Sequence, residues 1–273
     1  MHTDFRVSVE EFRKYKRLAL ASALFYKNPH QPYKSDHNMQ HALTVLLISL
    51  SMKHYLDRLY EKTRDARLWI DSVDTDAIAL ASFLHDSQRE GDILESLIAL
   101  QKHGQLAADY IMSHRESLLL LLGRKSDTIK QRKENEITLQ KAAEICLHHE
   151  EQWTGKMDFP EFLLVAASDR ATLPRIMISY HDGESLAATA GIRSGIYKLI
   201  VQTRAEKYED SAEYPKGFPH LIQKFLDIGA ALCLLSSNIL LSKKTLSVRE
   251  KFSPDRQWEA VEKAALELAL LRK

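Results

Sequence analysis

The sequence predicts an all-α protein. Its 273 residues include only nine glycines and seven prolines, the two residue types that interrupt helices most strongly. Leu, Ala, Glu, Lys and Arg are abundant, and apolar residues recur at helical spacing. No segment of useful length alternates between apolar and polar residues as a half-buried strand does. We therefore expect helices and no β-sheet.

Six helices are expected before residue 180, with more toward the C-terminus. The segment 41–60 is typical, because Leu43, Leu46 and Leu50 recur near the helical period with polar residues between them. Such a helix should bury one broad face. The expected ranges are 9–25, 41–60, 76–85, 92–114, 136–149 and 160–178.

Polar residues mark three of the helix starts. Ser8, with Glu11 three residues later, has the capping-box pattern for the first helix. Ser35 and Asp36 are candidate caps for the helix that carries His41, and residues 74–76 could cap the one that ends at His85.

Length and composition favour one compact body with three parts. Residues 1–29 should form an N-terminal helix on a helical core of residues 30–180, and residues 181–273 a C-terminal helical extension of the same body. These last helices carry no chemical signature and could close the site, act as a scaffold or form a homodimer. The charged run 123–134 is expected to be a solvated loop or an exposed helix end, the alternative being a basic loop that gates a ligand.

Charge and cysteine content exclude several classes. The 38 basic and 37 acidic residues nearly balance, so the net charge of +1 gives no overall attraction to nucleic acid or to an acidic membrane. Cys146 and Cys233 lie in apolar segments and match neither a zinc knuckle nor a disulfide framework, so both should be reduced. The N-terminus carries charges where a signal peptide is apolar, and polar residues interrupt the longest apolar run, 226–241. We expect a cytoplasmic protein that does not enter a membrane.

A buried helix delivers two chemically active side chains. The apolar run 78–84 leads directly into His85 and Asp86. An imidazole in that position must find a polar partner, and a bound metal ion would supply one. The second His-Asp pair, His181–Asp182, precedes a glycine and is expected in a surface turn.

Further histidines and one aspartate could join the same site. His37 and His41 are four residues apart and therefore share a helical face. Asp169 ends the apolar run 162–168 and is the type of buried carboxylate that needs a cation.

The order His41, His85–Asp86, Asp169 within apolar helices resembles the HD-domain superfamily of metal-dependent phosphohydrolases, over roughly residues 30–180. The resemblance implies a multi-helix HD-type bundle with additional C-terminal helices. It also implies that these four residues bind metal. His37-Asn-Met-Gln-His41-Ala-Leu-Thr-Val45 is similar to a segment of class I cyclic nucleotide phosphodiesterases, which makes His37 a candidate general acid. His85-Asp-Ser-Gln-Arg89 is similar to the family's His-Asp-x-Gly-Lys, so Arg89 is expected to contact a substrate phosphate.

Three more histidines, His103, His148 and His149, resemble the additional ligands of the HD-GYP branch and imply a second metal ion, held by His103 with one or both of the other two. The Gly-Tyr-Pro triplet of that branch is replaced by Asp158-Phe159-Pro160, so its cyclic dinucleotide substrate is not implied. Asp86 would bridge the two ions.

The resemblance implies hydrolysis of a small phosphoester, a nucleotide being the favoured class, with one or two divalent ions from among Mn, Fe, Ni, Mg and Zn. Two other functions are compatible with the ligand types. The first is a di-iron oxygenase of the same fold, because ligand chemistry does not separate iron from manganese here. The second is a non-catalytic HD-like binding module.

Overall fold

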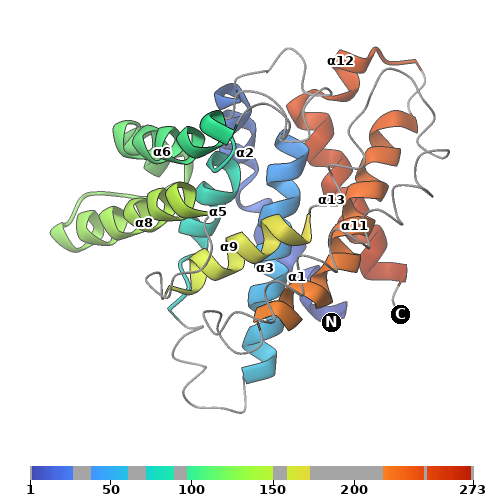
Figure 1. Ribbon diagram of the computed structural model, residues 1–273, viewed down its shortest axis with the longest axis horizontal. Helices are drawn as coiled ribbons and strands as arrows, with labels where there is room; N and C mark the ends of the chain where they lie inside the picture. Colours follow the sequence, from blue (N-terminus) through green and yellow to red (C-terminus); the bar gives the residue numbers. More distant parts are fainter. Residues whose placement is uncertain are drawn as a thin grey trace.

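The computed structural model describes residues 2–26, 38–60, 72–88, 97–149, 159–172, 218–242 and 245–271 (Figure 1). All regular elements within these ranges are helices, which confirms the all-α prediction. After α1 (His2–Arg13), α2 (Lys16–Ser22) and the short 3-10 helix η1 (Ala23–Phe25), the helices are α3 (Met39–Tyr60), α5 (Thr75–Leu84), α6 (Leu97–Ser113), α7 (Arg115–Leu121), α8 (Ile129–His148), α9 (Pro160–Ala171), α11 (Phe218–Ser242), α12 (Val248–Lys251) and α13 (Pro254–Leu271).

The N-terminal helix differs from the expected range 9–25. Helix α1 already includes His2, and Ser8 lies buried within it, so the prediction that Ser8 caps the helix is wrong. The chain turns after Arg13 through two short-range bonds, from the Lys14 amide to the Glu11 carbonyl and from the Tyr15 amide to the Phe12 carbonyl, both 3.0 Å. Helix α2 begins after this turn.

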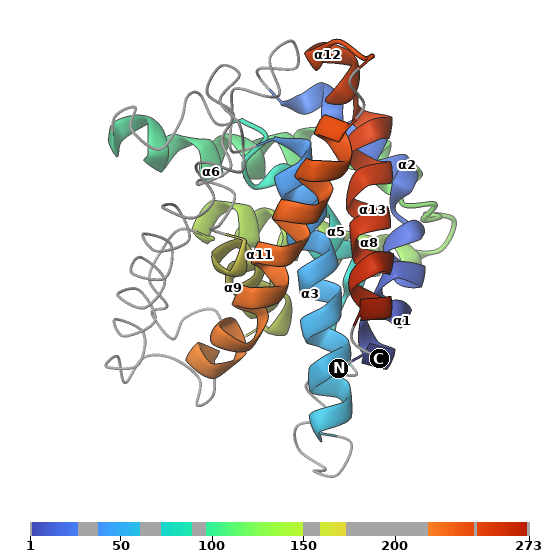
Figure 2. The same ribbon diagram turned by 90° about the vertical axis from the view of Figure 1, so that its right-hand side faces the viewer.

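Helix α3 forms the centre of the molecule and packs against α1, α5, α9, α11 and α13 (Figure 2). All residues from Asn38 to Met52 are buried, so the expectation of a single buried face is wrong for this part of the helix. A helix that is covered on all sides must be predominantly apolar, and its few polar side chains must find partners inside the protein. Asn38 begins α3 by accepting a bond from the His41 amide at 3.1 Å; Ser35 and Asp36 lie outside the described residues.

Helix α5 is short and buried over Ala77–Leu84. Its N-cap is Asp74, whose side chain accepts bonds from the amides of Asp76 and Ala77, as the sequence predicts. Packing against α3, α8 and α9 covers its sides, and His85 and Asp86 at its C-terminal end are buried inside the protein.

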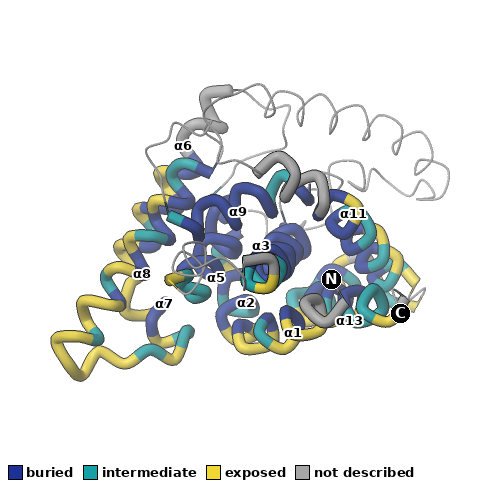
Figure 3. The backbone as a smooth tube through the Cα atoms, turned by 90° about the horizontal axis from the view of Figure 1, so that it is seen from below, coloured by how far each residue is buried: buried dark blue, intermediate teal, exposed yellow. Residues whose placement is uncertain are grey.

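Helices α6 and α8 pack against each other beside this core, and Figure 3 shows that the far end of α8 and its loop to α7 are largely exposed. Helix α8 starts earlier than expected, at Ile129, because Thr128 and Gln131 form a capping box. The charged run 123–134 is therefore an exposed loop and helix end, which confirms that prediction.

Helices α11 and α13 pack against each other and both contact α3. Within the described residues, the segment Phe225–Ser242 is the one long enough and apolar enough to cross a membrane, with a mean hydropathy of 1.7. Half of it is buried inside the protein, so length and composition are weak evidence for a membrane span. Cys146 and Cys233 are both free and buried, as expected.

Candidate metal centre

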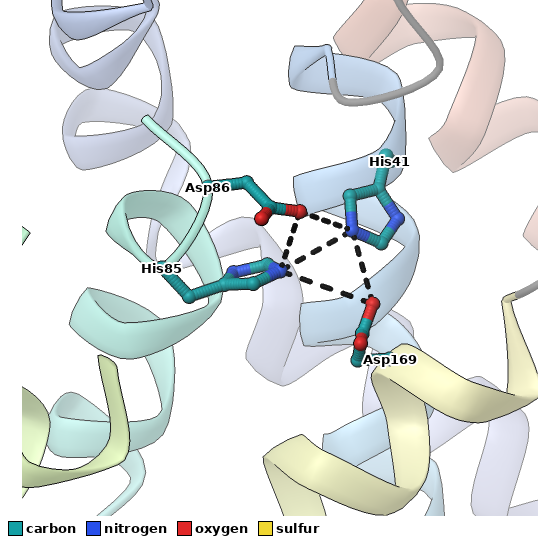
Figure 4. Close-up of side chains that lie close together, drawn as sticks. All are labelled: His41, His85, Asp86 and Asp169. Atoms are coloured by element: carbon teal, nitrogen blue, oxygen red, sulfur yellow. Dashed lines mark hydrogen bonds and ion pairs between the residues drawn. The ribbon is translucent and has the colours of Figure 1, made fainter. Parts of the chain in front are cut away.

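Four side chains from three helices meet at one point (Figure 4). His41 lies in the first turn of α3, His85 and Asp86 follow the last turn of α5, and Asp169 lies near the end of α9. The side chains of His41, His85 and Asp86 are at most 2% exposed, and that of Asp169 is 16% exposed. The structure thus brings together all four residues of the predicted first group.

The ligand atoms of this group are close enough to share one ion. Nε2 of His41 lies 3.2 Å from Nε2 of His85, 3.2 Å from Oδ2 of Asp86 and 3.3 Å from Oδ1 of Asp169. Nε2 of His85 lies 3.1 Å from Oδ2 of Asp86 and 3.9 Å from Oδ1 of Asp169. With metal–ligand bonds of about 2.1 Å, neighbouring ligand atoms lie ~3.0 Å apart in an octahedral site and ~3.4 Å apart in a tetrahedral one. The observed separations fall around these values.

The outward nitrogen of His85 is bound to its own helix. Nδ1 lies 3.0 Å from the Ser82 carbonyl and 3.2 Å from the Ala81 carbonyl, both of which are acceptors. Nδ1 therefore carries a proton, so that in the neutral ring, the form that binds metal, the lone pair is on Nε2. That lone pair is directed at the other three residues.

The last two carbonyl groups of α5 also have partners. The hydroxyl of Tyr26 donates to the Phe83 carbonyl at 3.1 Å, and the hydroxyl of Ser87 donates to the Leu84 carbonyl at 2.8 Å. Carbonyls at a helix end otherwise lack partners, so these bonds stabilise the turn that carries Asp86. Tyr26 has a raised pKa, because it is buried and because Asp86 is negatively charged, so it remains a neutral donor.

The tautomer of His41 follows from a similar contact. The hydroxyl of Thr172 donates its proton to the Asp169 carbonyl at 2.7 Å. It can therefore only accept from Nδ1 of His41, which lies 3.3 Å away. In its neutral form, His41, like His85, therefore directs the lone pair of Nε2 inward.

A second group consists of Asp86, His103 on α6 and His149, which follows the last residue of α8. The Nε2 atoms of the two histidines are 3.3 Å apart, and they lie 3.6 Å and 3.8 Å from Oδ1 of Asp86. Nδ1 of His149 donates to the Cys146 carbonyl at 2.8 Å, which again leaves the lone pair on Nε2. All three residues are buried.

Asp86 belongs to both groups, and its two oxygens are divided between them. Oδ2 faces His41 and His85, whereas Oδ1 faces His103 and His149. The rings of His85 and His149 are 4.9 Å apart, so the two groups are adjacent. Each oxygen of Asp86 is therefore available to a different group of ligand atoms.

The chemistry of these atoms fits a cation. Lone pairs of imidazole and carboxylate groups that face one another at such distances repel, and burial keeps bulk water from relieving the repulsion. Imidazole nitrogen and carboxylate oxygen are suitable ligands for divalent transition metals. Cys146 lies near Asp86, but burial and then the charge of Asp86 raise the pKa of its thiol, so it is no thiolate ligand at neutral pH. The cluster could therefore hold metal ions through nitrogen and oxygen ligands.

The structure distinguishes between the two adjacent histidines of the predicted second group. Of the adjacent histidines, His149 joins the second group, and the half-buried His148 belongs to neither group. His37 and Arg89, as well as the pair His181–Asp182, lie outside the described residues.

Sequence reasoning missed three residues that support the ligands. Tyr26 and Thr172 bond to the site as described above. Arg170 donates to the Ala166 carbonyl at 2.9 Å and to the His149 carbonyl at 3.4 Å, so it links the ends of α8 and α9. The only signal in the sequence is that Arg170 directly follows Asp169 and that Thr172 lies three residues after it.

No family model matches the chain, and no curated protein or solved structure is significantly similar to it.

Proposed function

We propose that the protein is a metal-dependent phosphohydrolase of the HD type, which cleaves a small phosphoester with water activated at a centre of two metal ions. The observation that carries this proposal is Asp86, whose two oxygens face two separate groups of histidines. Divalent ions bound there would polarise a phosphoryl oxygen and would lower the pKa of bound water, so that hydroxide would be available near neutral pH.

Each group of the centre has its own ligand set. His41, His85, Asp169 and Oδ2 of Asp86 would hold one ion, and His103, His149 and Oδ1 of Asp86 the other. The second set has three protein ligands, which leaves room for water or substrate oxygens. Nitrogen and oxygen ligands suit Mn, Fe, Ni and Zn, and leave Mg as a weaker candidate.

Two residues complete the proposed chemistry. Arg89 would orient and partly neutralise the substrate phosphate, and His37 would protonate the departing oxygen. A nucleotide is the substrate class that we favour. Reduced, buried Cys146 and Cys233 agree with the cytoplasm as the compartment.

The experiment uses the purified protein loaded separately with manganese, nickel or iron. We expect hydrolysis of bis-p-nitrophenyl phosphate, or of members of a nucleotide panel, under at least one metal. Asp86→Ala should abolish turnover, because it removes a ligand from both groups. Asp127→Ala, at an exposed position before α8, is the matched control and should retain full activity.

Other outcomes distinguish the alternatives. Iron-dependent oxygen consumption without hydrolysis under any metal would replace the proposal by an oxygenase. Absence of bound metal by elemental analysis would favour a non-catalytic binding module.

A further inference from the structure

The helix that carries His41 is held at its start by the C-terminal part of the chain. The amide of Gln40, one residue before His41, donates to Oε1 of Gln257 on α13 at 2.8 Å. This amide lies in the first turn of α3, where the helix itself offers no acceptor. A residue 217 positions away therefore caps the metal-binding helix.

The same contact extends to α11 through the Gln40 side chain. Its Nε2 donates to the hydroxyls of Ser236 at 2.7 Å and Ser237 at 2.9 Å. Gln257 is fixed in turn, since its Nε2 donates to the Phe252 carbonyl at 2.6 Å. The four side chains are all buried, so a lost bond leaves a polar group without water to replace its partner.

Helix α11 also supports the helix end that carries Asp169. A Cβ atom at Gly229 would overlap the Ala171 carbonyl oxygen and lie 2.9 Å from its carbon. Only a residue without a side chain permits this approach between the two backbones. Asp169 lies two residues before this contact, and Thr172, which bonds to His41, directly follows it.

The second group is supported at a different place. A Cβ atom at Gly104 would lie 2.6 Å from the Cys146 carbonyl oxygen and 3.0 Å from that of Leu147. Gly104 follows His103, and the Cys146 carbonyl is the acceptor for His149. Close packing of α6 on α8 therefore places the two histidines of this group.

We infer that the C-terminal helices α11 and α13 set the geometry of the first metal group, with Gln257 and Gly229 as positioning residues, while the α6–α8 contact at Gly104 sets the second. Substitutions can then lower the metal affinity of one group without that of the other, although Asp86 belongs to both. This inference rests on the proposed metal centre, and it gives the C-terminal helices a role in metal binding.

In the test, the metal-free protein is titrated with Co(II), and binding is measured by calorimetry and by visible absorption. His41→Ala disrupts the first group and gives the reference spectrum of cobalt at the second. His103→Ala disrupts the second group and gives the reference spectrum of cobalt at the first. We expect Gln257→Leu and Gly229→Ala to weaken one site on the order of 10–100-fold, the usual effect of losing a partner that orients a ligand. At low cobalt concentration the ion should then occupy the second group first, so the spectra of these two variants should match that of His41→Ala. The spectrum of Gly104→Ala at low cobalt concentration should instead match that of His103→Ala.

Controls separate this role from general loosening of the fold. Asp227→Asn, exposed on α11 two residues from Gly229, should bind cobalt as the wild type does. Ser236→Ala and Ser237→Ala remove smaller parts of the same network and take the place of Gln257→Leu if that variant does not fold. Equal weakening of both sites in the C-terminal variants, or unchanged binding, would overturn the inference alone. A wild-type protein that binds no cobalt would overturn the metal centre and the inference together.

Discussion

At the scale of single residues, the centre depends on which nitrogen of each histidine carries the proton. His41, His85 and His149 each place Nδ1 against an oxygen that can only accept, so each offers Nε2 to the interior. Two of these acceptors are main-chain carbonyls, which no substitution of a side chain removes. The third, the Thr172 hydroxyl, can be removed.

Thr172→Val should therefore weaken metal binding at the first group. Valine keeps the shape of threonine but offers no oxygen to Nδ1 of His41, so the ring is free to rotate and to change tautomer. We expect a loss on the order of 10–100-fold in affinity for one ion, measured by competition with a chromophoric chelator. Thr172→Ser retains the hydroxyl and should bind as the wild type does. Equal affinity in the valine and serine variants would show that Thr172 does not orient His41.

At the scale of helices, the two ends of α5 have different roles: one anchors the helix in the fold and the other carries candidate metal ligands. Its C-terminus carries His85 and Asp86, and its N-terminus is fixed by Asp74, which also pairs with Arg124 at 3.1 Å and accepts a bond from Thr138. The buried carboxylate of Glu161 accepts from the Asp74 amide at 2.6 Å and pairs with Lys141 at 2.7 Å. These bonds connect α5 to α8 and α9 at the end away from the metal ligands.

Asp74→Ala should lower the stability of the whole fold without a specific loss at the metal centre. Removal of an N-cap costs about 1 kcal/mol, within a range of about 0.5–2. Arg124 and Thr138 would lose a partner as well, which places the expected cost toward the upper end. Urea unfolding measures it. Asp74→Asn keeps an oxygen that accepts the capping bonds, so it should lower the free energy of unfolding by less. If both variants lower it equally, the charge of Asp74 stabilises the fold and its capping bonds do not.

At the scale of the whole molecule, the two metal groups join α3, α5, α6, α8 and α9, whose ligands span positions 41 to 169. Much of the core is apolar and does not include these ligands: α3 as far as Met52, for example, is buried on all sides. Bound metal should therefore stabilise a fold that also forms without it.

Removal of metal by a chelator should lower the unfolding temperature reversibly. An ion present at a hundredfold excess over its Kd stabilises the folded state by about 2.7 kcal/mol. Differential scanning calorimetry with and without added manganese measures the shift. His41→Ala should show a smaller shift, since one group is incomplete. A chelated protein that shows no helical signal at all would contradict the independence of the core.

The sequence predicts best what is decided locally. Asp74 and the apolar run of α5 lie within a dozen residues of His85 and Asp86, so cap, helix and ligands could be found together. The sequence could not predict which of His148 and His149 joins the site. Neighbouring residues project about 100° apart on a helix, and the packing of α8 decides which one points inward. Gln257 and Gly229 act on residues far away in the chain, and no local pattern shows such contacts. Helix α1 was missed at its start because its capping pattern lies inside the helix.

The sharing of Asp86 between the two groups has a consequence for charge balance. Among the residues that the structure describes, the two groups contain two carboxylates, Asp86 and Asp169, and the other ligands are imidazoles, which bind metal in their neutral form. Two divalent ions would therefore be only half neutralised by the protein, in a place where uncompensated charge is costly. Under the proposed function, hydroxide together with a phosphate group would supply the negative charge that these two carboxylates do not. Inorganic phosphate is a tetrahedral oxyanion like the reacting group, so under the proposed function it should compete with the substrate.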